Sequence, residues 1–252
     1  MKRRTVLALG GGVAAIGALT AVGVNVVSPY MPGRPLPTGA LRVDKAIDVT
    51  FGDFRLVIDG GRFAVTRGTR TVWAVSGPFL LCGTGRLHWT QKRGHFTAKS
   101  RLDDLQDTVA VSHALVDGST VTVHGVASGA GTAEQFVLAM TGDSRGLDLD
   151  LHCPGAGFVA FRAELGADEG VHGCGAQFTD FDLRGQALLL VTREQGVGRG
   201  TQPLTMLAEV TQGVGGSVTS TYAPMPALVT DSFRGLSWTN DEVAQVDLRT
   251  TN

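Results

Sequence analysis

Two carboxylates, Asp180 and Asp182, stand two residues apart in a glycine-rich run of the chain. On an extended segment this spacing points both carboxylates the same way, about 6–7 Å apart, which lies within the range of paired glycosidase carboxylates. Acid catalysis requires one carboxyl group to stay protonated while its neighbour is ionised. Nothing in this polar neighbourhood forces that difference. We therefore expect neither residue to be catalytic, and we assign no catalytic residue to the chain.

The polar groups around these carboxylates suit sugar binding instead. We expect Asp182 and Arg184 to pair with each other or with backbone groups and so to hold the loop. Polar loop residues on a rigid scaffold are well placed to meet sugar hydroxyls. This leaves Gln177, Asp180 and Arg199 available to face a cleft. For Arg199, a structural partner and a ligand contact are both open.

A different chemistry would use His172, which precedes the turn Gly173-Cys174-Gly175. A sugar epimerase needs a histidine and a glutamate as acid and base, and His172 with Glu194 is the pair that this alternative would use. We predict no cofactor and no metal, because the histidines and cysteines lack the spacing of metal ligands.

Three cysteines, Cys82, Cys153 and Cys174, are an odd number with no C-x-x-C spacing. A zinc framework is therefore not expected, and at least one thiol must stay free or pair between chains. A disulfide between Cys153 and Cys174 is one alternative. Buried free cysteines are the other.

The elements that must position these residues are predicted to be strands. Short runs with period-two alternation recur between glycine-containing turns such as Asp59-Gly60-Gly61, which predicts antiparallel hairpins. About a dozen such strands indicate an all-β chain with two antiparallel sheets packed face to face, an antiparallel β-sandwich. The predicted strands are 54–58, 62–66, 71–75, 109–113, 120–124, 135–140, 147–151, 158–165, 188–192, 204–210, 218–222 and 227–230.

The amino terminus has the pattern of an export segment. Paired arginines, Arg3 and Arg4, precede an uncharged stretch, so residues 1–28 are predicted to be a twin-arginine-like signal peptide or a membrane anchor. Residues 29–40 form a proline-rich linker, and 41–252 a single β-sandwich domain. The chain is expected outside the cytoplasm, touching a membrane only through an uncleaved first segment.

Composition excludes one class of partner. The net charge is −1, and no run of lysine or arginine occurs beyond the first four residues. The positive surface that neutralises a phosphate backbone is missing. Nucleic acid is therefore not an expected partner, whereas carbohydrate is.

The run from Val171 to Arg199 resembles a segment of family 31 glycoside hydrolases. Their amino-terminal β-domain closes with the pattern G-C-G-E-Q-F…F-D-L-R-G…E-Q-G-V-G-R, above all in the sulfoquinovosidase branch, which cleaves sulfosugar glycosides. The resemblance extends over roughly residues 60–238 of this chain. The matching residues are Gly173, Cys174, Gly175, Gln177, Phe178, Phe181, Asp182, Leu183, Arg184, Gly185, Glu194, Gln195, Gly196, Val197, Gly198 and Arg199.

The resemblance implies a galactose-mutarotase-like sandwich that lends a loop to the pocket of a retaining α-glycosidase. The residues that it places at the rim of this substrate pocket are Gln177, Phe178, Asp180, Arg184, Gln195 and Arg199. In that family the catalytic aspartates lie on a (β/α)8 barrel, which needs about 200 residues or more, and only a short stretch follows Trp238 here. The resemblance therefore implies a domain that is inactive alone, with a separately encoded catalytic barrel as an expected partner. Ala176 departs from the pattern, because the family has a glutamate there. A stand-alone carbohydrate-binding or scaffold protein is the alternative.

Overall fold

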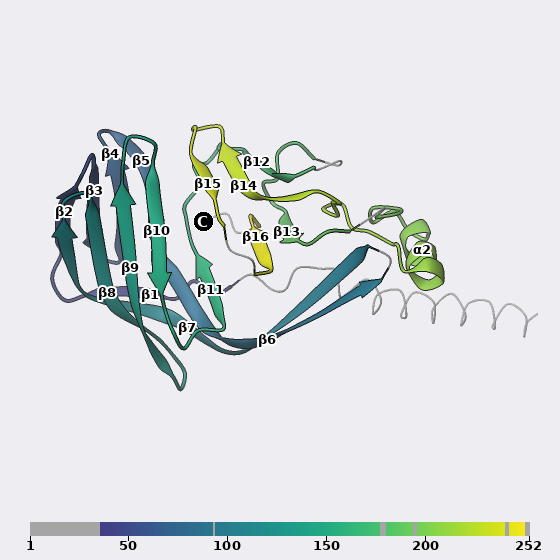
Figure 1. The fold of residues 1–252 in the computed structure, drawn as a ribbon, viewed down its shortest axis with the longest axis horizontal. Helices are drawn as coiled ribbons and strands as arrows, with labels where there is room; N and C mark the ends of the chain where they lie inside the picture. Colours follow the sequence, from purple (N-terminus) through teal and green to yellow (C-terminus); the bar gives the residue numbers. More distant parts are fainter. Residues whose placement is uncertain (1–35, 93, 177–179, 194–195, 240–241, 250–252) are drawn as a thin grey trace, which may run out of the picture. The chain divides into compact units, whose positions relative to one another are not determined.

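The computed structural model describes residues 36–92, 94–176, 180–193, 196–239 and 242–249. These residues form two compact units, and Figure 1 shows their strands and helix. The first, which we call the sandwich unit, comprises Leu36–Leu87 and Ser100–Asp168. The second, which we call the loop unit, comprises His88–Lys99 and the described residues from Glu169 onward. The predicted export segment 1–28 lies outside the described residues.

One sheet of the sandwich unit is a four-stranded antiparallel meander in the order β2-β3-β4-β5. Sequence neighbours pair throughout this sheet, as the short glycine turns between its strands predict. At the β3–β4 turn, Gly60 and Gly61 both have positive φ, of 55° and 81°, which side chains would resist. The strands are β2 (Ile47–Phe51), β3 (Phe54–Asp59), β4 (Arg62–Arg67) and β5 (Arg70–Ser76).

The other sheet has seven strands, in the order β10-β9-β8-β7-β6-β11, with β1 paired to β7. The pairs β10–β9, β9–β8, β8–β7 and β6–β11 are antiparallel, whereas β1 runs parallel to β7. The tips of β6 and β7 belong to the loop unit. The strands are β1 (Ala40–Val43), β6 (Leu80–Lys92), β7 (His95–Asp117), β8 (Thr120–Gly129), β9 (Ala133–Gly142), β10 (Leu147–His152) and β11 (Phe158–Phe161).

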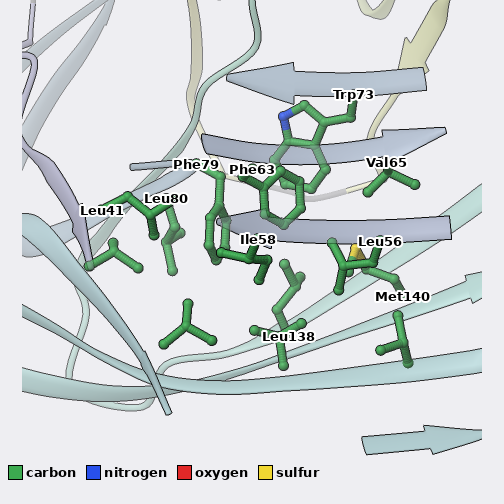
Figure 2. Packing of buried hydrophobic residues seen from close by; sticks show 14 of the residues in the cluster. Leu41, Leu56, Ile58, Phe63, Val65, Trp73, Phe79, Leu80, Leu138 and Met140 are labelled. Atoms are coloured by element: carbon green, nitrogen blue, oxygen red, sulfur yellow. The ribbon is translucent and has the colours of Figure 1, made fainter. Parts of the chain in front are cut away.

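Alternating burial shows that both sheets share one core. On β3, Phe54, Leu56 and Ile58 are buried while the residues between them are less so, and on β9 Leu138 and Met140 enter the same cluster. Figure 2 shows these aliphatic side chains around the stacked rings of Phe63 and Phe79. A core enclosed by two mainly antiparallel sheets confirms the predicted β-sandwich. The mutarotase-like topology stays a prediction.

The loop unit contains two small sheets, in the orders β12-β14-β15 and β13-β16. Their shared core is a compact cluster in which Cys174, Leu183 and Leu188 are buried. The elements are β12 (Val171–Gly175), β13 (Ala187–Leu190), α2 (Leu204–Gln212), β14 (Pro224–Thr230), β15 (Gly235–Ser237) and β16 (Ala244–Asp247).

Two predicted strands of the loop unit are wrong. Residues 204–210 form helix α2 instead, because leucine, methionine, alanine and glutamate favour helix and Gly213 ends it in the left-handed conformation. Residues 218–222 belong to a turn in which the Ser220 hydroxyl accepts the Ser217 backbone N–H at 2.8 Å. Such local side-chain bonds compete with strand pairing. The strand predicted over 158–165 ends at Phe161.

Of the two alternatives for the cysteines, the structure favours thiols without a Cys153–Cys174 disulfide. None of the three cysteines forms a disulfide, and Cys174 is buried in the cluster of the loop unit. Cys153 instead packs against the core of the sandwich unit, which contains Cys82. Among the described residues, no helix has the length and hydropathy to cross a bilayer.

Candidate functional site

The Gly173-Cys174-Gly175 turn is a β-bulge that ends β12. All three residues have positive φ, of 118°, 59° and 102°, and the register of β12 against β14 shifts between the two glycines. The extra residue of a bulge re-aims a side chain, and here it places the Cys174 thiol among Leu183 and Leu188. Burial raises the pKa of this thiol to about 11, so Cys174 is a packing residue rather than a nucleophile.

Asp182 holds the loop that follows the bulge. Its Oδ1 accepts the backbone N–H of Val171 at 2.9 Å and that of Arg184 at 3.0 Å. The first of these bonds is the largest cause of the lowered pKa of Asp182, and the second adds to it. The expectation that Asp182 binds backbone groups is thus confirmed.

Asp180 and Asp182 are not on an extended strand, contrary to the geometry considered for a catalytic pair. They lie in a bend, where Asp180 Oδ2 accepts the side-chain amide of Gln186 at 3.4 Å while Asp182 binds backbone. The strand spacing that would set their carboxylates about 6–7 Å apart therefore does not apply. Asp180 is exposed at the surface of the loop.

A buried ion pair lies at the base of this loop. The Glu169 carboxylate is 4% exposed and faces the Arg234 guanidinium with both oxygens, one of which accepts Nε at 2.9 Å. Thr230 donates its hydroxyl to the same carboxylate. Arg184 Nη1 donates to the Glu169 backbone carbonyl at 2.9 Å. Arg184, which was predicted at the pocket rim, thus ties the loop to the segment that leads into β12.

His172 connects the loop to the turn after β14. Its Nδ1 lies 2.9 Å from the Phe181 carbonyl oxygen and its Nε2 lies 2.8 Å from Asp231 Oδ1. Each ring nitrogen faces an acceptor, so both bonds form only when the imidazole carries two protons. The Phe181 carbonyl, followed by the Asp231 carboxylate, raises the pKa of His172. With both nitrogens engaged, this geometry does not favour His172 as the acid–base group of an epimerase.

This arrangement predicts a pH-dependent loop. Because the folded pKa of His172 lies above its ordinary value of 6.5, the stabilising effect of its two hydrogen bonds is complete below about pH 6.5 and is lost as pH rises through the folded pKa. Titration of the His172 ring protons by NMR is expected to give a pKa above 6.5, and Asp231→Asn is expected to lower it. A His172 that titrates below 6.5 in the native chain would contradict this arrangement.

The remaining predicted rim residues divide into two groups. Arg199 donates Nη1 to the Ser220 carbonyl at 2.9 Å, which favours the structural alternative for this residue. Gln177, Phe178 and Gln195 lie outside the described residues, as does Glu194 of the epimerase alternative. Their placement at a pocket rim stays a prediction.

Sequence reasoning missed two features of this site. Phe181 stacks on the His172 ring with centroids 4.4 Å apart and is 84% exposed. Asp231 also accepts the backbone N–H of Gly170 at 3.0 Å. One carboxylate therefore binds both His172 and the residue directly before β12. The exposed ring was visible in the sequence as an aromatic residue between two aspartates. The Asp231 contact had no signal, because it joins residues 59 apart.

The carboxylates at the described loop bind backbone and side-chain donors of the chain itself. The carboxylates of Asp182, Asp231 and Glu169 all accept structural hydrogen bonds, and those to Asp182 lower its pKa. A general acid requires a carboxyl group held protonated. Among the described residues, no cluster of three metal-ligating side chains occurs.

The sandwich and the bulged G-C-G loop place this chain among the relatives of family 31 glycoside hydrolases, and comparison with known proteins confirms that resemblance. The particular relatives are sulfoquinovosidases. The chain is 32% identical over 158 residues to the sulfoquinovosidase of Escherichia coli, which covers 60% of this chain. It is 31% identical over 179 residues to that of Agrobacterium fabrum, which covers 69%. No protein-family profile matches the chain.

The matched region is a minor part of each relative. The chain spans 22% of the length of the Escherichia coli protein and 25% of the Agrobacterium fabrum protein. A solved structure, a family 31 sulfoquinovosidase from E. rectale in complex with an aza-sugar inhibitor, matches 77% of this chain with a TM-score of 0.66. That match is 22% identical and covers 29% of the solved chain, so it supports the fold.

Proposed function

We propose that residues 41–252 are the accessory β-domain of a sulfoquinovosidase-like α-glycosidase of family 31, and that the loop after β12 forms part of the rim of its substrate pocket. The observation that carries this proposal is the way the loop is held. Asp182, Arg184 and the Glu169–Arg234 pair fix its base, while Asp180 and Phe181 remain exposed on it. A rigid loop that presents a carboxylate beside an aromatic ring suits a sugar, which has both hydroxyls and apolar C–H faces.

The same proposal assigns the bond-breaking carboxylates to a (β/α)8 barrel outside these 252 residues. In a retaining glycosidase one carboxylate attacks the anomeric carbon and another acts first as acid and then as base. The exposed loop residues Asp180 and Phe181 would orient the substrate, while Asp182 and Glu169 hold the loop. The similarity to sulfoquinovosidases makes a sulfosugar glycoside the first substrate class to test.

We also propose that the domain is exported. The support is the sequence of residues 1–28, where Arg3 and Arg4 precede an uncharged, alanine- and glycine-rich stretch. The route would be the twin-arginine translocase, whose address includes paired arginines. The sugar substrate would then be met outside the cytoplasm.

A domain exchange tests the pocket-rim role. The segment of the Agrobacterium fabrum sulfoquinovosidase that aligns with this chain is replaced by the corresponding residues from this chain, and turnover of an aryl sulfoquinovoside is measured. The chimera is expected to be active, and Phe181→Ala in the chimera is expected to raise KM severalfold with a smaller change in kcat. Asp148→Ala, an exposed change on β10, is the matched control and leaves both constants unchanged.

The isolated chain provides the complementary test. We expect it to turn over neither aryl sulfoquinovosides nor aryl α-glucosides. Turnover that disappears in Asp180→Asn or Asp182→Asn would show that this chain carries its own catalytic carboxylates and would overturn the proposal. If the chimera is active and Phe181→Ala leaves its KM unchanged, the loop does not contact the substrate, and the proposed pocket-rim role is wrong.

A stand-alone carbohydrate-binding protein is the second candidate, and the exposure of Phe181 favours it. Aromatic rings supply large contact area at low entropic cost. Calorimetric titration of the isolated chain with sulfoquinovose and with glucose distinguishes the two. Binding by the isolated chain that is lost in Phe181→Ala supports this candidate, whereas binding only in the chimera supports the accessory role.

A further inference from the structure

Two of the three thiols lie together in the sandwich unit. Cys82, on β6, is fully buried in the core, and Cys153 directly follows β10 and packs on the same core. Their side chains lie within hydrogen-bonding reach of each other, and the contact affects the ionisation of both. The residues are far apart in the sequence, so the fold rather than chain proximity brings them together.

The backbone around this pair is fixed by hydrogen bonds. The turn that leaves Cys153 is closed by the Ala156 N–H, which donates to the Cys153 carbonyl at 3.1 Å. It is tied to β6 by the Gly157 N–H, which donates to the Gly83 carbonyl at 2.9 Å. β11 then pairs Val159 with Cys82. The segment that follows Cys153 is thus hydrogen-bonded to β6 next to Cys82.

We propose that Cys82 and Cys153 are the site of an intrachain disulfide that forms when the chain meets a low-molecular-weight disulfide oxidant. The Cys153 thiolate attacks the oxidant, forming a mixed disulfide and releasing one thiol. The Cys82 thiolate then attacks Cys153 Sγ, closes the protein disulfide and releases the second thiol. Two protein thiols are oxidised and one small disulfide is reduced to two thiols, so atoms and electrons balance.

The order of the two steps follows from access and charge. Cys153 is partly exposed whereas Cys82 is fully buried, so Cys153 meets the oxidant first. Burial raises the pKa of Cys82 to about 12, and burial also raises that of Cys153, although the hydrogen bond from Cys82 opposes the rise. The nearby Glu134 carboxylate raises the pKa of both thiols, which restrains oxidation.

Cys174 is excluded from this site by its surroundings. It is buried in the cluster of the loop unit with Leu183 and Leu188, and desolvation is the cause of its raised pKa. The proposal therefore assigns the disulfide to Cys82 and Cys153 and leaves Cys174 outside it. It does not depend on the proposed glycosidase role.

Incubation of the folded, reduced chain with oxidised glutathione tests the pairing. The expected product has lost two hydrogen atoms in its intact mass, and its peptide map links Cys82 to Cys153. The cross-link closes a long loop, so the thermal midpoint is expected to rise by roughly 5–10 °C. Cys174→Ser retains the cross-link, whereas Cys82→Ser stops at the glutathione adduct on Cys153. A chain that keeps all its thiols, or links Cys174, overturns the assignment.

Glu134 gives a second test that does not remove a core thiol. Glu134→Gln is expected to speed cross-linking by about two- to fivefold, because it removes the negative charge that disfavours the Cys153 thiolate. Asp150→Asn, a charge-matched change at an exposed position of β10, is the control and leaves the rate unchanged. Equal rates in Glu134→Gln and the native chain would overturn the proposed attack by Cys153.

Discussion

Replacing Glu169 with alanine is expected to destabilise the loop unit by about 3–5 kcal/mol, because it leaves a guanidinium without its carboxylate partner in a buried setting. The Glu169 side chain is 4% exposed and that of Arg234 is 18% exposed. Thr230 loses the acceptor of its hydroxyl in the same change. The free energy of unfolding, measured by urea titration with a probe in the loop unit, gives the size of the effect.

A double variant separates the cost of an unpaired charge from the loss of the pair itself. Glu169→Ala with Arg234→Ala is expected to be more stable than Glu169→Ala alone, because no buried charge is left unpaired. Asp48→Asn is the control, because Asp48 and its partner Arg55 are both more than half exposed. This change is expected to leave the free energy of unfolding unchanged. A single variant as stable as the native chain would show that the pair does not hold the loop.

Much of the sandwich was predictable because many of its strands carry their own signal, although β1, β2 and β6 were not among the predicted strands. Alternation along β3 and β4 marks which residues face the core, and the intervening glycines mark the turns. Both kinds of information are local, since side chains alternate with a period of two along a strand. The burial of Phe54, Leu56 and Ile58 follows directly from that pattern. Consecutive hairpins then pair without any long-range information.

Long-range contacts of the candidate site were not predictable from one sequence. The Glu169 carboxylate meets Arg234, which is 65 residues away, and His172 meets Asp231 across 59 residues. No spacing rule relates such positions, because register between β12 and β14 is set only when the sheet forms. The resemblance located the loop, but the contacts that hold it became visible only in three dimensions.

The cysteines and helix α2 show two further limits. The pairing of Cys82 with Cys153 depends on how β6, β10 and β11 assemble, and spacing along the chain carries no connectivity. Helix α2 is only nine residues long, which is too short for its periodicity to be a clear signal in the sequence. A short run with weak amphipathicity can be taken for a strand when read by alternation alone.

Replacing Gly175 with alanine is expected to cost on the order of 3 kcal/mol or more, the second large effect predicted for this chain. Gly175 has a φ of 102°, which a side chain resists, and an added Cβ would lie 2.0 Å from the Ala223 carbonyl oxygen. Ala223 directly precedes β14, and its carbonyl accepts the Ala176 N–H at 3.1 Å, so this backbone cannot yield without breaking that bond. Gly175 is therefore required for two reasons: its backbone conformation disfavours a side chain, and the neighbouring backbone leaves no space for one.

Gly185→Ala separates these two requirements, because Gly185 has a φ of 80° and open space where a Cβ would stand. Backbone strain alone is expected to cost about 1–2 kcal/mol there, so the difference between the variants measures the steric contact. Unfolding free energies from urea titration give both values. Equal costs would mean that β14 moves aside to admit a side chain, and the bulge would then not rigidly direct the loop that follows it. If Gly175→Ala lowers the free energy of unfolding more than Gly185→Ala does, the close backbone contact at Gly175 contributes beyond backbone strain. That contact would then help to fix the position of the loop that contains Asp180 and Phe181.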